Sequence, residues 1–375
     1  MERRDPARGR LLLCALVIAS LILPLLGAPA PASTEALKPQ PTVKAAFIYL
    51  ATVGDGGWTL AHDEARKATE QKLQPFLTTA YSEGVAEGAA AEQIIERYVR
   101  QGYNLIFATS FGYMDAVLAV AKRHPDVVFM HASGIKSAAN VGTYYGRMYQ
   151  ARYLTGLVAG KMTKSQIVGY VAAHPTPTVV RGINAFALGV RAANPKAKVR
   201  VVWTNSWYDA AKEREAAESL LDFGADVITQ HQDTPATQQA AERRGRYSIG
   251  YNADMRAFAP KAHLTAAIWR WERLYTDTVK QVQEGTWKSA HFWPGIESGV
   301  VDLAPFSEAV PAEVRTLVEA KKADIAAKRT DVFTGPIRDQ EGNVVVEAGK
   351  ALSDAEIVAI NFLVEGVVGT LPKRK

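Results

Sequence analysis

The sequence predicts an α/β protein with two doubly wound lobes around a hinged cleft. Short apolar runs rich in strand-forming residues alternate with amphipathic stretches of helical spacing, once over residues 44–145 and again over about 166–252. Near-continuous apolar strands separated by helices are typical of a parallel sheet covered on both faces. Because the series occurs twice, we expect two lobes with a cleft where they meet.

The first series predicts a five-stranded sheet with helices between the strands. Strand character occurs at 45–50, 76–81, 104–109, 127–131 and 141–145, and helical spacing at 60–73, 89–101 and 117–123.

The second series predicts another sheet of the same kind. Strand character occurs at 167–172, 199–203, 226–230 and 247–251, and helical spacing at 153–162, 179–193, 210–223 and 235–244. A further strand at 263–268 and a helix at 273–284 follow this series. Asn194-Pro195 and Gly224 are helix stop signals.

The C-terminal part has a different character. A turn cluster at 339–343 separates two strand-like runs and predicts a hairpin, and Ser353 with Glu356 has the spacing of a capping box that opens a helix. We expect residues 43–162 together with about 262–375 to form lobe 1, and residues 166–255 to form lobe 2.

Residues 1–32 have the features of a cleaved export signal. Four arginines precede the apolar run 11–26, and small residues such as Ala28 and Ala30 follow it. The run is slightly short for a membrane-spanning helix, which needs about 20 residues. The only cysteine, Cys14, lies inside it, so the mature chain has no disulfide or thiolate chemistry. We expect a periplasmic protein released by signal cleavage.

Charge and motif content narrow the possible functions. The formal net charge is +6, but Lys and Arg are scattered, so nucleic-acid binding is not expected. The hydrolase candidates are the run His62-Asp63-Glu64 and the pair His231 and Asp233. Contiguous helical residues do not face one another, and the pair lacks a nucleophile. A periplasmic hydrolase is therefore the weakest alternative, and we expect a binding protein without metal or cofactor.

In open α/β sheets, ligands bind at the carboxyl ends of the strands. In the first lobe, residues 54–58 follow a strand, and their three glycines let the backbone turn tightly and present Trp58 beside Asp55. Ser110, Phe111 and Gly112 follow another strand of the same lobe.

The second lobe offers a similar set of side chains. Asn205 and Trp207 follow one strand, and Asn252 and Asp254 follow another. The strand at 263–268, which comes after this series, adds Trp269. Two tryptophans facing across a cleft form a slot for a flat ring, with stacking worth about 1–3 kcal/mol per base. A sugar also stacks on tryptophan, so a receptor for a sugar or signalling ligand stays open.

The same loops resemble the basic membrane protein (Med/BMP) family of ABC-transporter receptors. The matching stretches are VGDGGWTLAHDE at 53–64, TSFGYMD at 109–115, NSWYD at 205–209 and FTGPI at 333–337. The resemblance covers about residues 43–371. It implies a type I periplasmic-binding-protein fold and delivery of purines to an inner-membrane ABC permease.

The resemblance also implies roles for individual residues. Trp58 and Trp207 correspond to the two aromatics that hold the base, and Asp55 to an acidic residue near the first aromatic. Asn252 stands where the family has an acidic residue on the base edge. Trp269 stands near the position at which nucleoside receptors of the family have a lysine that binds the ribose. We expect Asp55, Ser110 and Asn252 to read the base edge. Because an indole cannot replace an ammonium group, we expect an adenine-like free base in preference to a nucleoside, which stays open.

Overall fold

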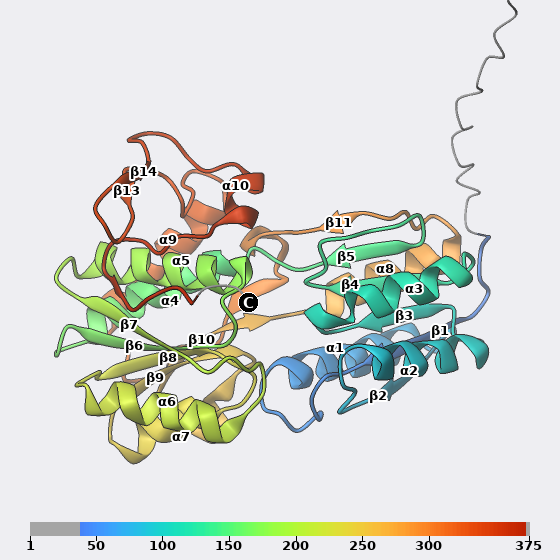
Figure 1. Cartoon of the computed structure of the whole chain (residues 1–375), viewed down its shortest axis with the longest axis horizontal. Helices are drawn as coiled ribbons and strands as arrows, with labels where there is room; N and C mark the ends of the chain where they lie inside the picture. The colour runs from blue at the N-terminus through green and yellow to red at the C-terminus, as the bar shows by residue number, and fades with distance from the viewer. Residues whose placement is uncertain (1–37, 373–375) are drawn as a thin grey trace, which may run out of the picture. The chain divides into compact units, whose positions relative to one another are not determined.

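The fold is taken from a computed structural model that describes residues 38–372 (Figure 1). The expected signal, residues 1–32, lies outside the described residues. Within the described part, no helix is long and apolar enough to cross a membrane.

The first sheet has six parallel strands in the order β11-β5-β4-β3-β1-β2. These strands are β1 (Val43–Ile48), β2 (Leu77–Ser82), β3 (Leu105–Ala108), β4 (Val128–Ala132), β5 (Val141–Tyr144) and β11 (His291–Phe292). The five predicted strands are confirmed. Helices α1 (Trp58–Leu73) and α8 (Glu272–Glu284) pack on one face, and α2 (Ala89–Arg100) and α3 (Met114–Arg123) on the other. This covering of both faces explains why the central strands are apolar throughout.

The second sheet has seven strands in the order β12-β10-β9-β8-β6-β7-β15, all parallel except β12, which is antiparallel to β10. They are β6 (Ile167–Ala172), β7 (Lys198–Trp203), β8 (Val227–His231), β9 (Tyr247–Asn252), β10 (His263–Trp269), β12 (Val301–Leu303) and β15 (Val367–Val368). Figure 1 shows α4 (Met148–Met162) and α5 (Pro177–Ala193) on one face, and α6 (Ala210–Asp222) and α7 (Ala236–Arg243) on the other.

Glycines allow α4 and α5 to pack very closely. A Cβ at Gly156 would lie 2.2 Å from the carbonyl oxygen of Phe186, and a Cβ at Gly189 would lie 2.1 Å from that of Tyr153. Only glycine leaves room for backbones at this separation. This packing holds α5 closely against α4.

The remaining elements include three short 3₁₀ turns, η1 (Phe111–Tyr113), η2 (Met255–Phe258) and η3 (Ile296–Ser298). The C-terminal segment contains α9 (Ala312–Ala326), β13 (Ile337–Arg338), β14 (Val344–Val346) and α10 (Asp354–Ala359). The predicted hairpin is confirmed, because β13 and β14 pair antiparallel. The predicted capping box is confirmed too, with reciprocal bonds between Ser353 and Glu356 at the start of α10.

Sheet membership differs from the expected lobe boundaries. Helix α4 packs on α5 and the second sheet, whereas residues up to 162 were expected in lobe 1. Strands β10 and β15 also join the second sheet, because β10 pairs with β9 and β15 with β7. Of the segment after residue 262, only α8 and β11 belong with the first sheet.

The chain passes between the two sheets three times: after β5, after β10, and between β11 and β12. The crossings meet at Gly146, where a Cβ would lie 2.5 Å from Val301 Cγ2 and 2.8 Å from Trp269 Cζ3. In addition, the Trp293 indole N–H donates to the Gly146 carbonyl oxygen at 3.2 Å. Because segments distant in sequence pack here, this point fixes how the two lobes are joined.

Candidate ligand-binding site

Loops from both lobes line a cavity that opens to solvent; its volume is about 50 Å³ for the centres of water-sized molecules and about 510 Å³ when all the space between atoms and the open mouth are counted. The first lobe, which is built on the six-stranded sheet, contributes Leu50, Trp58, Thr109, Ser110, Phe111 and Ser133. The second contributes Thr176, Thr178, Trp207, His231, Asp233 and Tyr251, and Tyr145 lines the cavity from the first crossing segment. Most of these residues lie just after the carboxyl end of a parallel strand, where α/β sheets bind ligands.

Trp58 is the first residue of α1 and is half-buried. Its indole N–H donates to the carbonyl oxygen of Thr109 at 2.6 Å. The ring contacts His62 edge-on at a centroid distance of 4.4 Å, and His62 stacks on Trp271 at 5.2 Å. Because the N–H is already bonded and aromatic rings support the indole, Trp58 offers the cavity an apolar surface in a fixed orientation.

Trp207 lines the same cavity from the loop after β7. It is half-buried and packs edge-on against His174 at a centroid distance of 4.9 Å. Its carbonyl oxygen accepts from the Asp233 backbone N–H at 3.2 Å, which ties two strand-end loops together. The two tryptophans expected to sandwich a ligand thus both lie on the wall of one cavity, one from each lobe.

Asp55 is buried and does not line the cavity. Its carboxylate accepts from the backbone N–H groups of Gly57, Thr59 and Leu60 at 2.7–2.9 Å. Burial raises the pKa of Asp55, and these three bonds act in the opposite direction. The structure therefore gives Asp55 a capping role at the start of α1, in place of the expected contact with the ligand edge.

Ser110 and Phe111 line the cavity, but Gly112 does not. The Ser110 hydroxyl donates to Glu87 Oε1 at 2.6 Å, and the Gly112 N–H donates to the same oxygen at 3.0 Å. A Cβ at Gly112 would lie 2.1 Å from the Glu87 carboxyl carbon. Gly112 thus leaves room for the Glu87 carboxylate. Glu87, which sequence analysis did not single out, holds the loop in place through these hydrogen bonds.

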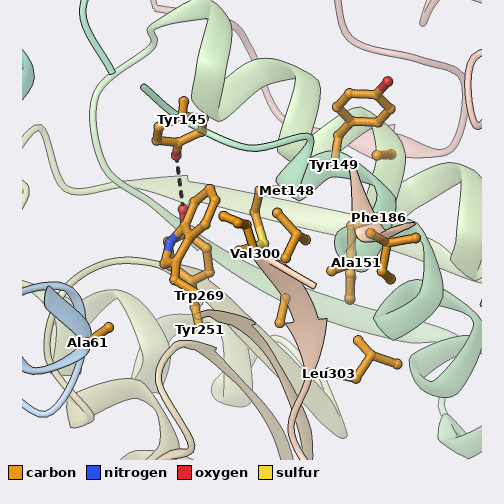
Figure 2. Close-up of a cluster of buried hydrophobic side chains, with 14 of the residues drawn as sticks. Ala61, Tyr145, Met148, Tyr149, Ala151, Phe186, Tyr251, Trp269, Val300 and Leu303 are labelled. Carbon is orange, nitrogen blue, oxygen red and sulfur yellow. Dashed lines mark hydrogen bonds between the residues drawn. The ribbon is translucent and has the colours of Figure 1, made fainter. Parts of the chain in front are cut away.

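Asn252 and Trp269 lie behind the cavity wall instead of on it. Asn252 is fully buried with φ of 72°, and its Oδ1 accepts from the Trp269 indole N–H at 3.0 Å. Its Nδ2 donates to Asp233 Oδ1 at 3.3 Å. The Trp269 ring packs edge-on against Tyr145 at 4.7 Å (Figure 2). Asn252 thus combines a positive φ with a side-chain amide that is hydrogen-bonded within the protein. The expectation that Asn252 reads the base edge is corrected accordingly.

Asn205 and Asp254 also lie outside the cavity lining. Asn205 is exposed, with φ of 53°. Asp254 caps the 3₁₀ turn η2 by accepting from the Arg256 N–H at 3.1 Å, and it lies 3.6 Å from His263. Both residues shape loops near the site.

Three polar residues of the lining form a connected network. The Tyr145 and Tyr251 hydroxyls are 3.3 Å apart (Figure 2), and the Tyr251 hydroxyl is 3.2 Å from His231 Nε2. Burial, reinforced by Arg152 and Arg181, holds the pKa of His231 well below its ordinary value. The imidazole is therefore neutral at physiological pH.

Asp233 is the acidic group of the lining. Burial raises its pKa well above the ordinary value, and the carboxylates of Asp55 and Glu213 add to the shift. The expected site set did not include Tyr145, Tyr251, His231 or Asp233. A signal for Tyr145 and Asp233 was present, because they follow β5 and β8 within two residues.

The hydrolase candidates do not assemble into a catalytic set. Buried His62 contacts the Tyr275 hydroxyl through Nδ1, and Asp63 pairs with Arg66 and Lys67 at 2.8 Å each. None of these residues lines the cavity that contains His231 and Asp233. Over residues 38–372, no group of three His, Cys, Asp or Glu side chains is arranged to hold a metal ion.

Comparison with known proteins identifies the class. Residues 42–332 match the family model described as ABC transporter substrate-binding protein PnrA-like (Bmp). The chain is 45% identical over 331 residues to the purine-binding protein BAB2_0673 of Brucella abortus, covering 88% of this chain and 94% of that protein. It is 40% identical over 331 residues to the putative ABC transporter glucose-binding protein TsgA13 of Haloferax volcanii, covering 88% and 82%.

A solved structure supports the same class. The ABC transporter solute-binding protein from Conexibacter woesei superposes with a TM-score of 0.65 at 26% identity, covering 77% of this chain and 98% of that chain. The chain belongs to the Bmp, PnrA-like family of ABC transporter substrate-binding proteins. The predicted periplasmic-binding-protein fold and the family resemblance are confirmed. Proteins of this class bind small molecules and work with a membrane permease.

Proposed function

We propose that this protein captures a purine, as a free base or a nucleoside, between its two lobes and delivers it to the permease of an ABC importer. With the export signal expected at residues 1–32, capture takes place in the periplasm. The similarity to a purine-binding protein at 45% identity supports this ligand class.

One observation carries the proposal: Trp58 and Trp207 come from different lobes and line the same cavity. Two indoles on opposite lobes suit a flat heterocycle, because aromatic stacking accepts any base face. Ser133 from the first lobe and Asp233 from the second add polar groups to the lining of this cavity. Such groups give specificity through hydrogen bonds with the ring edge.

Capture requires the lobes to close on the ligand. Gly57 of the first lobe lies close to the second lobe, since a Cβ on it would be 2.4 Å from the Asp233 carbonyl oxygen. We propose that the three crossing segments act as the hinge and that this close approach belongs to the closed state.

The expectation of a free, adenine-like base rested on Asn252 at the ring edge and on Trp269 in place of a ribose-binding lysine. In the structure Asn252 is engaged by Trp269 and Asp233. Adenine therefore loses the support of Asn252, while the two tryptophans and the 45% identical purine-binding relative still support the purine class. The 40% identical relative described as a putative glucose-binding protein favours a second candidate, a sugar, since tryptophan also stacks on sugar rings.

Mass spectrometry of ligand released from protein purified under gentle conditions tests the proposal. We expect the released ligand to be a purine. In a thermal-shift screen, purines should raise the melting temperature of the protein and glucose should not. A ligand at a hundredfold excess over Kd stabilises by about 2.7 kcal/mol. Release of a hexose, or a shift with glucose alone, would overturn the purine assignment in favour of the sugar.

A further inference from the structure

The start of helix α5 forms one wall of the cavity and presents hydrogen-bond donors. Thr176 and Thr178 line the cavity there, and Thr176 Oγ1 has no hydrogen-bond partner within the described residues. Helix α5 is 17 residues long and has Pro177 at its first position. The free N–H groups of a helix N-terminus carry partial positive charge, so this wall favours acceptor atoms on a ligand.

Arg181 lies one turn further along α5 and is only 6% exposed. Its Nη2 donates to Thr178 Oγ1 at 3.2 Å, and across residues 38–372 no carboxylate is paired with it. A buried guanidinium without a counter-ion is costly and leaves donors unused. These donors point to an acceptor group that comes from outside the chain.

The contact between Arg181 and Thr178 sets the polarity of the wall. Because Thr178 Oγ1 accepts from Arg181, its own proton is free to donate into the cavity. Arg181 also lines a vestibule that continues from the cavity and shares five lining residues with it: Phe111, Ser133, Tyr145, Thr176 and Thr178. Thr178 therefore faces both spaces, and a ligand that reaches from the cavity into the vestibule meets both donors.

We propose that Arg181 and Thr178 select a 6-oxopurine, such as hypoxanthine or guanine, over adenine. The inference rests on the proposed function. The edge of an oxopurine presents two acceptors, O6 and N7, which arginine recognises in a bidentate manner. Adenine presents an amino donor at the position of O6. Against a wall of donors, that amino group leaves buried polar atoms unpaired, which is expensive.

Calorimetric titration of the whole mature protein with hypoxanthine and adenine tests the selection. We expect wild type to bind hypoxanthine at least about tenfold more tightly, the size of one charge-assisted hydrogen bond. Arg181→Met should lose about that factor for hypoxanthine and leave adenine nearly unchanged, while Arg181→Lys recovers part of the loss. Arg200→Met is the matched control, because Arg200 lies in the same lobe and packs on Phe223 away from the cavity.

The outcomes separate this inference from the proposal beneath it. Adenine binding as tight as hypoxanthine, or an equal loss for both in Arg181→Met, overturns the selection and leaves purine capture intact. If no purine binds wild type, both fall. Should Arg181→Met fail to fold, the wild-type preference and Thr178→Val decide the matter, with Thr178→Val expected to weaken hypoxanthine more than adenine.

Discussion

The indole N–H of Trp58 donates to the carbonyl oxygen of Thr109 at 2.6 Å. This bond joins the first residue of α1 to the end of the neighbouring strand β3 and fixes the indole on the cavity wall. With its only polar atom engaged, Trp58 acts on a ligand through its ring. Trp207 lines the same cavity from the other lobe.

Removing either ring should weaken purine binding. Trp58→Ala and Trp207→Ala should each cost about 1–3 kcal/mol of binding free energy, the usual contribution of stacking on one base. Trp58→Phe should lose less, because a ring remains. Calorimetry measures the effect, with Trp203→Ala as control since Trp203 lies outside the cavity lining and bonds Thr370. An equal loss in the control would contradict the assignment.

Asp55 should matter for stability more than for ligand choice. Asp55→Ala removes the acceptor for three backbone N–H groups at the start of α1 and should lower the free energy of unfolding by about 1–2 kcal/mol. Asp55→Asn, which keeps one acceptor, should lose less. Urea denaturation measures this, and a titration with two purines should give an unchanged preference. If a variant changed the preference between the two purines without changing the free energy of unfolding, Asp55 would contact the ligand edge instead of capping the helix.

A methyl group at Gly57 should oppose closure. The added Cβ would lie 2.4 Å from the Asp233 carbonyl oxygen, so Gly57→Ala forces the two lobes apart in the closed state. Overpacking of this kind costs about 1–3 kcal/mol, which appears as weaker binding. Gly54→Ala is the matched control, because a Cβ there meets nothing within 4 Å.

Small-angle scattering adds a second measurement for Gly57→Ala. With saturating ligand, the variant should retain a larger radius of gyration than wild type, and Gly54→Ala should match wild type. Identical compaction and identical affinity in all three proteins would mean that the two lobes do not close at this contact.

The buried carboxyl of Glu213 should make stability depend on pH. Burial raises its pKa to about 7 from 4.5. The stabilisation from its protonated form is complete below pH 4.5 and is lost as the pH rises through 7. Glu213→Gln keeps the neutral form, so it should gain about 3 kcal/mol relative to wild type between pH 4.5 and 8. Urea denaturation at both pH values measures this difference. A constant difference would show that Glu213 titrates normally.

The principle that ligands bind at the carboxyl ends of parallel strands predicted much of the site from the sequence. Trp58, Trp207, Ser110 and Phe111 follow strands and line the cavity. The rule does not specify where a side chain points. Asn252 also follows a strand, but its backbone has φ of 72° and its amide is bonded within the protein.

The sheet membership of some strands and the surroundings of Arg181 could not be predicted from the sequence. The apolar runs predicted the strands, but the expected boundaries placed β10 in lobe 1, whereas it pairs with β9 of the second sheet, and this pairing depends on tertiary contacts. Arg181 lies in the second turn of α5 and not at a strand end. Its lack of a carboxylate partner in the described chain is visible only in three dimensions.

The most direct test of the account is a calorimetric titration of the mature wild-type protein with hypoxanthine, adenine, guanosine and glucose. We predict saturable one-to-one binding of at least one purine, abolished or strongly weakened in a Trp58→Ala, Trp207→Ala double variant that remains folded. Binding of glucose with no heat from any purine, or purine binding unaffected in the double variant, would contradict it.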